Sequence, residues 1–99
     1  MEKKQLYAVT AHDGTDLQAL DRRMAAREMH LAVARQMKAD GKIIQAGALL
    51  GNDGRMVGSL LIVAFASRAE LDAWLATDPY VTGNVWRHIE VHPFQPAPI

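Results

Sequence analysis

The sequence contains no cysteine among its 99 residues. This removes disulfides, thiolate metal sites and a cysteine nucleophile together, and it is typical of a reducing compartment. The net charge is zero as well, because 11 basic and 11 acidic side chains cancel. A nucleic-acid binder normally carries a clustered basic surface, and the sequence has no basic stripe interleaved with aromatic residues. These absences exclude a disulfide scaffold and disfavour a nucleic-acid partner.

Long apolar runs are also missing. The longest, Leu60 to Ala66, is far shorter than the roughly 20 residues needed to cross a bilayer. The first residues lead directly into a strand pattern with no apolar signal region. We therefore expect a cytoplasmic protein without a membrane partner. A chain of this length is expected to form one domain over residues 1–99, with a core over about residues 5–94 and a C-terminal tail over residues 95–99.

Hydrophobic periodicity predicts six elements in the order βαββαβ. Strands are expected at Leu6–Thr10, Lys42–Leu50, Val57–Ala66 and Asn84–Pro93, helices at Thr15–Asp40 and from Ser67 to about Thr77, and a turn at His12-Asp13-Gly14. Thr15 and Ser67 each precede Gln or Glu by three residues, which is the spacing of a capping box at a helix start. Gly41 can adopt the left-handed conformation that follows a helix end. The order predicts an α+β, ferredoxin-like fold with two helices on one face of a four-stranded antiparallel sheet.

The strand at Val57–Ala66 is apolar throughout rather than alternating, so both of its faces should be covered. In a two-layer fold the helices cover only one face of the sheet. An exposed apolar patch on the other face usually marks an interface. We therefore expect a homodimer that packs through the open sheet face.

The last strand places three potential metal ligands on one face, together with Trp86. These are His88, Glu90 and His92, which alternate along the strand. Imidazole and carboxylate groups suit zinc or iron. An edge strand that faces water or a dimer partner produces the same pattern, and we predict no metal.

The long helix carries charge on the side that should face the core. At about 100° per residue, Arg23, Arg27 and His30 fall in the same half as apolar residues such as Met24 and Met37. Burying charge is costly unless it is paired. A simple interpretation is that His30 is a satisfied core imidazole and that Arg27 extends its head group to water.

Asp78 offers a partner for His30. Followed by Pro79, it is typical of a turn or helix-cap residue. In the predicted fold the two helices lie side by side, so Asp78 can approach the middle of the first helix. A carboxylate there would fix the His30 tautomer and offset the cost of its burial. Such a pair could act as a general acid or base, and Arg27 could bind a carboxylate or an enolate oxygen.

The motifs together resemble a known family. Arg27-x-x-His30-Leu31, Gly41-Lys42, Ala46-Gly47, Asn52-Asp53-Gly54, Gly58-Ser59, Ser67 and Asp78-Pro79-Tyr80 are similar, in order and spacing, to the YciI-like (YCII-related) family from Leu6 to about Phe94. The resemblance implies a dimeric α/β barrel of ferredoxin-like subunits and an active-site pair, His30 and Asp78. One member type is a dehydrochlorinase that acts on a chlorinated hydroxyhydroquinone. Ala48 departs from the family pattern, which favours proline there, and this affects the expected pocket wall.

The leading hypothesis is a cofactor-independent lyase or isomerase with His30 and Asp78 as catalytic residues. Its substrate would be small and aromatic or enolisable. Four further residues are expected to bind it: Arg27, Ser59, Tyr7 and Tyr80. The alternative is a non-catalytic ligand-binding or interaction module, because fold alone does not decide function. A ferredoxin-like RNA binder is disfavoured by the balanced charge and the lack of an aromatic platform.

Overall fold

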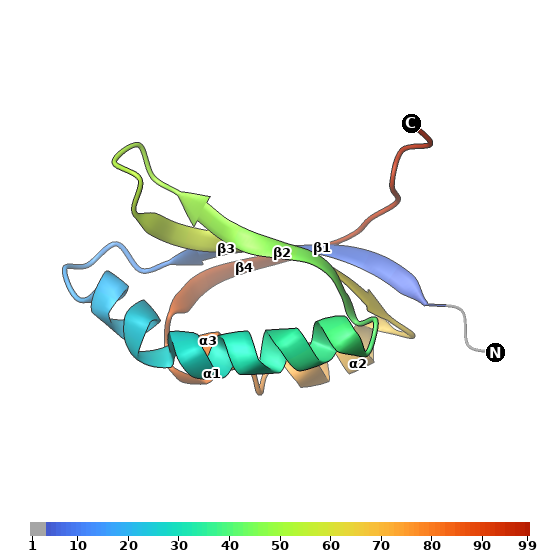
Figure 1. The fold of residues 1–99 in the computed structure, drawn as a ribbon, viewed down its shortest axis with the longest axis horizontal. Helices are drawn as coiled ribbons and strands as arrows, with labels where there is room; N and C mark the ends of the chain where they lie inside the picture. Colours follow the sequence, from blue (N-terminus) through green and yellow to red (C-terminus); the bar gives the residue numbers. More distant parts are fainter. Residues whose placement is uncertain (1–3) are drawn as a thin grey trace.

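The computed structural model of the chain describes residues 4–99. Its elements are β1 (Gln5–Asp13), α1 (Ala19–Ala39), β2 (Ile43–Leu50), β3 (Met56–Phe65), α2 (Arg68–Leu75), α3 (Pro79–Thr82) and β4 (Trp86–Pro93). The four strands form one antiparallel sheet in the order β2-β3-β1-β4. All helices lie on the same side of this sheet (Figure 1). The predicted ferredoxin-like fold is confirmed, with the short α3 as an additional element.

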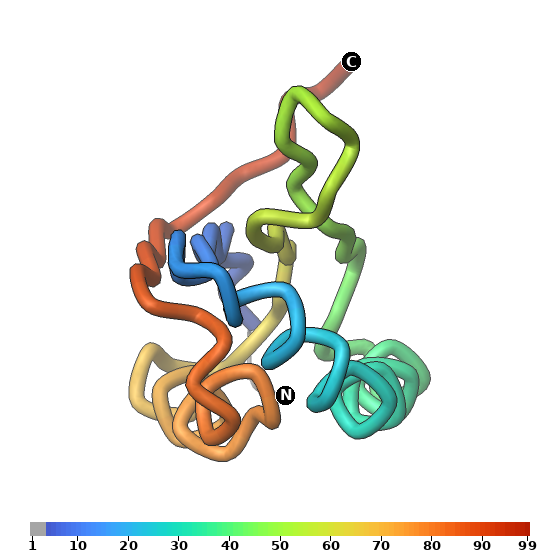
Figure 2. The backbone as a smooth tube through the Cα atoms, turned by 90° about the vertical axis from the view of Figure 1, so that its left-hand side faces the viewer, coloured from blue at the N-terminus to red at the C-terminus, as the bar shows by residue number. Residues whose placement is uncertain are grey.

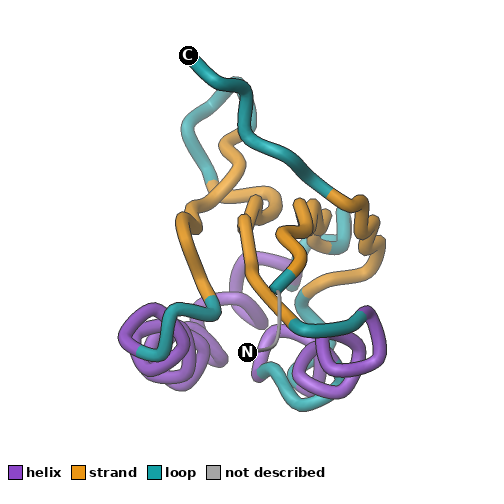
Figure 3. Tube along the Cα trace, turned by 90° about the vertical axis from the view of Figure 1, so that its right-hand side faces the viewer, coloured by secondary structure: helices purple, strands orange, loops and turns teal. Residues whose placement is uncertain are grey.

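Views along the molecule show how the helices share the covered face. In Figures 2 and 3, α1 lies under one half of the sheet, while α2 and α3 lie under the other half. The β2–β3 turn and the C-terminal segment rise on the opposite side. Within residues 4–99, no helix combines the length and the apolar character that a membrane span requires.

The start of α1 differs from the prediction. Strand β1 continues through His12 and Asp13, which pair with neighbouring strands, so the predicted turn was wrong at these two residues. The helix begins at Ala19, and no side chain caps it, so the capping box at Thr15 was also wrong. Asp16 instead accepts the Gln18 backbone N–H at 3.3 Å and pairs with Arg22 at 2.6 Å. The hydrogen bond from Arg22 holds the pKa of Asp16 well below its usual range.

Other helix boundaries follow the predicted chemistry. Ser67 Oγ accepts the Glu70 backbone N–H at 3.2 Å, which caps α2. Gly41 has φ = 76° just beyond α1, a conformation that glycine adopts without steric cost. Asp78 does not simply end the second helix. It is the N-cap of α3 and accepts the Tyr80 backbone N–H at 3.0 Å.

The core lies between the helices and the covered face of the sheet. It is built from alternate residues of β1 and β3, including Val9, Leu61 and Val63, which are at most 1% exposed. The predicted cover on both faces of β3 is only half present in this chain, since Leu60 is 40% exposed. Met24, which was expected to face the core, is 51% exposed, because the buried positions of α1 are Ala19, Arg23, His30 and Met37.

Strand β4 contains an irregularity that moves Trp86. His12 pairs with His88 but Asp13 pairs with Trp86, so the register shifts by one residue. A bulge of this kind breaks the alternation of side chains. The prediction that Trp86 shares a face with His88, Glu90 and His92 was therefore wrong. Trp86 is buried, whereas those three residues are exposed.

Candidate active site

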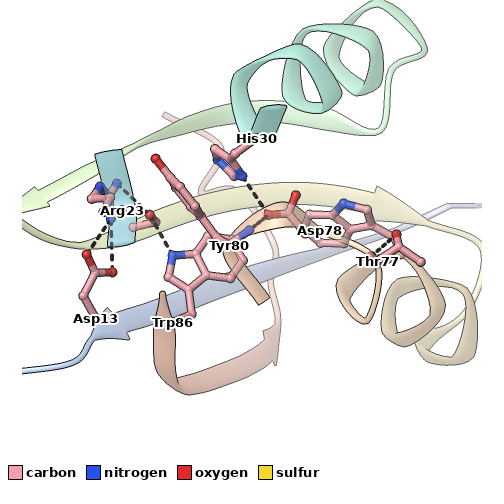
Figure 4. A network of polar contacts seen from close by, with 9 residues as sticks. Asp13, Arg23, His30, Thr77, Asp78, Tyr80 and Trp86 are labelled. Carbon is pink, nitrogen blue, oxygen red and sulfur yellow. Dashed lines mark hydrogen bonds and ion pairs between the residues drawn. The ribbon is translucent and has the colours of Figure 1, made fainter. Parts of the chain in front are cut away.

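The predicted contact between His30 and Asp78 is present in the structure. His30 Nδ1, from the middle of α1, lies 2.7 Å from Oδ2 of Asp78, which precedes α3 (Figure 4). The same oxygen accepts the Tyr80 backbone N–H, and Asp78 is only 1% exposed. The helix cap therefore holds the carboxylate in a fixed orientation, and the carboxylate in turn holds the imidazole.

This contact determines which His30 nitrogen is available. A carboxylate only accepts hydrogen bonds, so Nδ1 carries the proton and Nε2 of the neutral ring is unprotonated. No residue of the described chain, 4–99, forms a hydrogen bond with Nε2. His30 is 7% exposed and lines a cavity. Its Nε2 can therefore accept a proton from a molecule bound there.

Two aromatic rings hold the imidazole in place. Tyr80 stacks on His30 with ring centroids 3.8 Å apart and an interplanar angle of 12°. Trp86 meets His30 edge-on at 5.5 Å. Burial raises the pKa of the Tyr80 phenol, so its hydroxyl remains protonated and able to donate. In Figure 4 the hydroxyl end of Tyr80 points away from Asp78 and towards Arg23.

A second buried network adjoins the first. Both Asp13 oxygens accept from Arg23 Nη1, at 3.1 and 3.0 Å, and Ser59 Oγ accepts from Arg23 Nη2 at 3.1 Å. Trp86 Nε1 also donates to Ser59, at 3.1 Å. The Arg23 guanidinium carbon lies 4.8 Å from the Tyr80 ring centroid, within the range of a cation–π contact.

Three residues of this network were not identified from the sequence as site residues. Asp13 was assigned to a turn, Arg23 had no partner, and Trp86 was placed on the other face. One signal was available, because Asp13 continues the alternation of Tyr7, Val9 and Ala11, which are buried. A carboxylate at a core-facing strand position and an arginine on the apolar side of a helix each require a partner.

The cavity beside His30 has a volume of about 160 Å³. Its polar wall consists of Arg23, Arg27, His30, Ser59 and Tyr80, and apolar residues complete it: Leu31, Ala34, Ala46, Gly47, Ala48, Met56 and Leu61. Ala48, which departs from the family pattern, thus contributes to this wall. Tyr7 lies in the hydrophobic core and is not one of the lining residues.

The histidines and glutamate of β4 form a separate cluster on the exposed side. Glu90 lies 3.1 Å from His88 Nε2 and 3.5 Å from His92 Nε2. These hydrogen bonds, that from His88 foremost, lower the pKa of Glu90. Among residues 4–99, no three His, Cys, Asp or Glu side chains are arranged to hold a metal ion.

Comparison with known proteins assigns the family. The YCII-related domain matches residues 5–95. Protein YciI of Escherichia coli O6:H1 is 32% identical over 96 residues, which cover 91% of this chain and 96% of that protein. The chain belongs to the YCII-related family. This confirms the family resemblance found in the sequence.

Solved structures extend the comparison of this YCII-related domain. The 5-chloro-2-hydroxyhydroquinone dehydrochlorinase of Burkholderia phenoliruptrix AC1100, in complex with 2,5-dihydroxybenzoquinone, is similar with a TM-score of 0.81 and 26% identity, over 91% of this chain and 93% of that chain. A dimeric ferredoxin-like protein from Jannaschia sp. CCS1 has a TM-score of 0.50 and 18% identity, over 92% and 98%, and shows the fold alone. The family and the dehydrochlorinase together support a role on a small molecule, as an enzyme or as a binding protein.

Proposed function

We propose that this protein is a cofactor-independent lyase or isomerase in which His30 acts as the general base and Asp78 orients it. The observation that carries the proposal is the 2.7 Å contact between His30 Nδ1 and Asp78 Oδ2, beside a cavity that His30 lines. A general base must reach the proton that it removes. His30 Nε2, unpaired within residues 4–99, meets this requirement for a substrate bound in the cavity.

The dimensions and polarity of the cavity indicate the substrate class. A cavity of about 150 Å³ can hold benzene, and the present one, at about 160 Å³, is of similar size. Arg27 contributes a positive charge to the wall, and no hydrogen-bond or ion-pair partner for its side chain is present in residues 4–99. We therefore propose a single-ring, hydroxylated aromatic or enolisable substrate. The ligand of the 26% identical dehydrochlorinase belongs to this class.

The proposed reaction begins with transfer of a substrate proton to His30 Nε2. The electron pair of the broken bond forms a new double bond in the substrate. In an elimination, a leaving group such as chloride departs with its own electron pair, and the proton later passes to water. In an isomerisation, the proton returns to a different carbon. Arg27 and Tyr80 lie where they can stabilise negative charge that develops on a substrate oxygen.

Chloride release from 5-chloro-2-hydroxyhydroquinone tests the lyase proposal. We expect the purified protein, under anaerobic conditions, to release chloride faster than a protein-free control. Deuterium incorporation into the recovered substrate in D₂O detects an isomerase-type proton transfer. If the compound binds but neither reaction occurs, the non-catalytic ligand-binding alternative, in which Arg27 and His30 only hold an anion, replaces the proposal.

We also propose that two copies of the chain pack through the open sheet face. Leu60 is 40% exposed there, and it lines a hollow of about 190 Å³ with Leu49 and Ile62. Light scattering should show a dimer. We expect its interface to bury about 1,200 Å² or more in total. Leu60→Glu should produce monomers. Leu17→Glu is the matched control, because Leu17 is 94% exposed and lies in the loop before α1. A wild-type monomer at micromolar concentration would contradict the proposal.

A further inference from the structure

The hydroxyl group of Ser59 has an unusual hydrogen-bonding position. Its oxygen accepts from Arg23 Nη2 and from Trp86 Nε1, each at 3.1 Å, and Ser59 is 3% exposed. Guanidinium and indole N–H groups donate but do not accept. A serine oxygen has two acceptor positions, and both are occupied. The proton of the Ser59 hydroxyl is therefore the only hydrogen-bonding capacity that remains.

That proton has no acceptor in the described part of the chain. None of the hydrogen bonds within residues 4–99 has Ser59 Oγ as the donor. Ser59 lines the same cavity as His30. The hydroxyl proton is thus free to point to a molecule in the cavity.

The remaining polar groups of the wall have the same character. Arg27 donates only, and the Tyr80 hydroxyl stays protonated because burial raises its pKa. The acceptors among these side chains are the Tyr80 oxygen, which also donates, and His30 Nε2, which the proposed function uses for proton transfer. The wall therefore offers donors to an oxygen that carries negative charge, and it offers no serine lone pair to a neutral O–H group.

We infer that the Ser59 hydroxyl group donates a hydrogen bond to an anionic oxygen of the ligand and thereby selects the ionised form of the ligand. Arg23 and Trp86 act as positioning residues, because they occupy both acceptor positions of the Ser59 oxygen and leave only its O–H donor. The inference rests on the proposed function for the ligand class, a hydroxylated quinone or its enolate. It adds that Ser59 distinguishes the charge state of the ligand, and that Arg23 and Trp86 restrict the Ser59 hydroxyl group to donating.

The two positioning residues are themselves held rigidly. Arg23 is bound through Nη1 to both oxygens of Asp13, with side-chain exposures of 4% and 3%. Trp86 is fixed at the irregular pairing with Asp13 and packs edge-on against Tyr80 with centroids 5.4 Å apart. Neither donor can turn away from Ser59 without breaking buried contacts. The direction of the hydroxyl proton is therefore set before a ligand arrives.

Calorimetric titration with two probes tests the inference. The first is 2,5-dihydroxybenzoquinone, which is anionic at neutral pH, and the second is 2,5-dimethoxybenzoquinone, which cannot ionise. Ser59→Ala should weaken binding of the anion about 10- to 100-fold, the range for a hydrogen bond to a charged group. Binding of the dimethoxy compound should change little. Thermal unfolding of each variant verifies that it is folded.

A pair of tryptophan variants separates positioning from packing. Trp86→Phe removes the indole N–H that donates to Ser59 Oγ and should weaken anion binding roughly 3- to 10-fold. Trp74→Phe is the matched control, because Trp74 Nε1 is buried without a partner in the described residues and Trp74 does not line the cavity. Its preference for the anion over the dimethoxy compound should equal that of the wild type.

The inference is overturned if Ser59→Ala binds the anion as tightly as the wild type does. It is also overturned if the wild type prefers the anion no more than the dimethoxy compound. The proposed function fails separately, through the absence of chloride release and deuterium incorporation. A protein that binds the anion through Ser59 but transforms nothing would retain this inference and lose the proposed reaction.

Discussion

Replacing His30 with Asn is expected to lower kcat by about 10²- to 10⁴-fold, the usual contribution of a positioned general base. Affinity for 2,5-dihydroxybenzoquinone should stay close to that of the wild type, because proton transfer contributes mainly in the transition state. Asn is preferred to Ala for a structural reason. Its amide N–H can take the place of Nδ1 and donate to Asp78, so the buried carboxylate keeps its partner. Ala would leave Asp78 without its partner, so a loss of activity could result from lower stability rather than from the missing base.

Chloride release or deuterium incorporation measures the effect, and titration with 2,5-dihydroxybenzoquinone measures binding. His92→Asn is the matched control, since this imidazole has 65% side-chain exposure and its side-chain hydrogen bond within residues 4–99 is with Glu90, away from the cavity. Its activity should equal that of the wild type. If His30→Asn retains activity within a few-fold of the wild type, His30 is not the base and the proposed mechanism is wrong.

Replacing Asp13 with Ala is expected to lower the free energy of unfolding by about 3–5 kcal/mol, the cost of breaking a buried ion pair by removing one partner. Arg23 would remain in the core with its charge uncompensated, and both side chains are at most 4% exposed. Domains of this size have total stabilities of about 5–15 kcal/mol. The variant should therefore unfold at a much lower urea concentration than the wild type.

Two controls isolate the buried charge. Asp16→Ala removes the partner of Arg22 in an exposed pair and should have only a small effect, because water screens such charges. The double variant Asp13→Leu/Arg23→Met removes both charges and should recover most of the lost stability. If Asp13→Ala costs no more than Asp16→Ala, the pair of Asp13 and Arg23 does not stabilise the fold in this way.

The order of the four strands and the two longer helices, the fold and the family could be predicted from the sequence alone. Hydrophobic periodicity and residues such as Ser67 and Gly41 act locally, so their effect can be read from neighbouring positions. The contact of His30 with Asp78 was also predictable, although the residues are 48 positions apart. The βαββαβ order places the segment that follows the second helix on the same face of the sheet as α1, and a polar residue on an apolar helix face requires a partner.

Only the tertiary structure decided how the rest of the site is built. Asp16 rather than Thr15 satisfies the backbone before α1, because Arg22 holds its carboxylate in place. The register shift between β1 and β4 turns Trp86 towards Ser59, and a one-residue irregularity leaves no mark in the alternation of the sequence. Asp13 and Arg23 meet only once strand and helix have packed. The register shift and the contact of Asp13 with Arg23 depend on which of several competing long-range partners packs best, and local patterns carry no information about that competition.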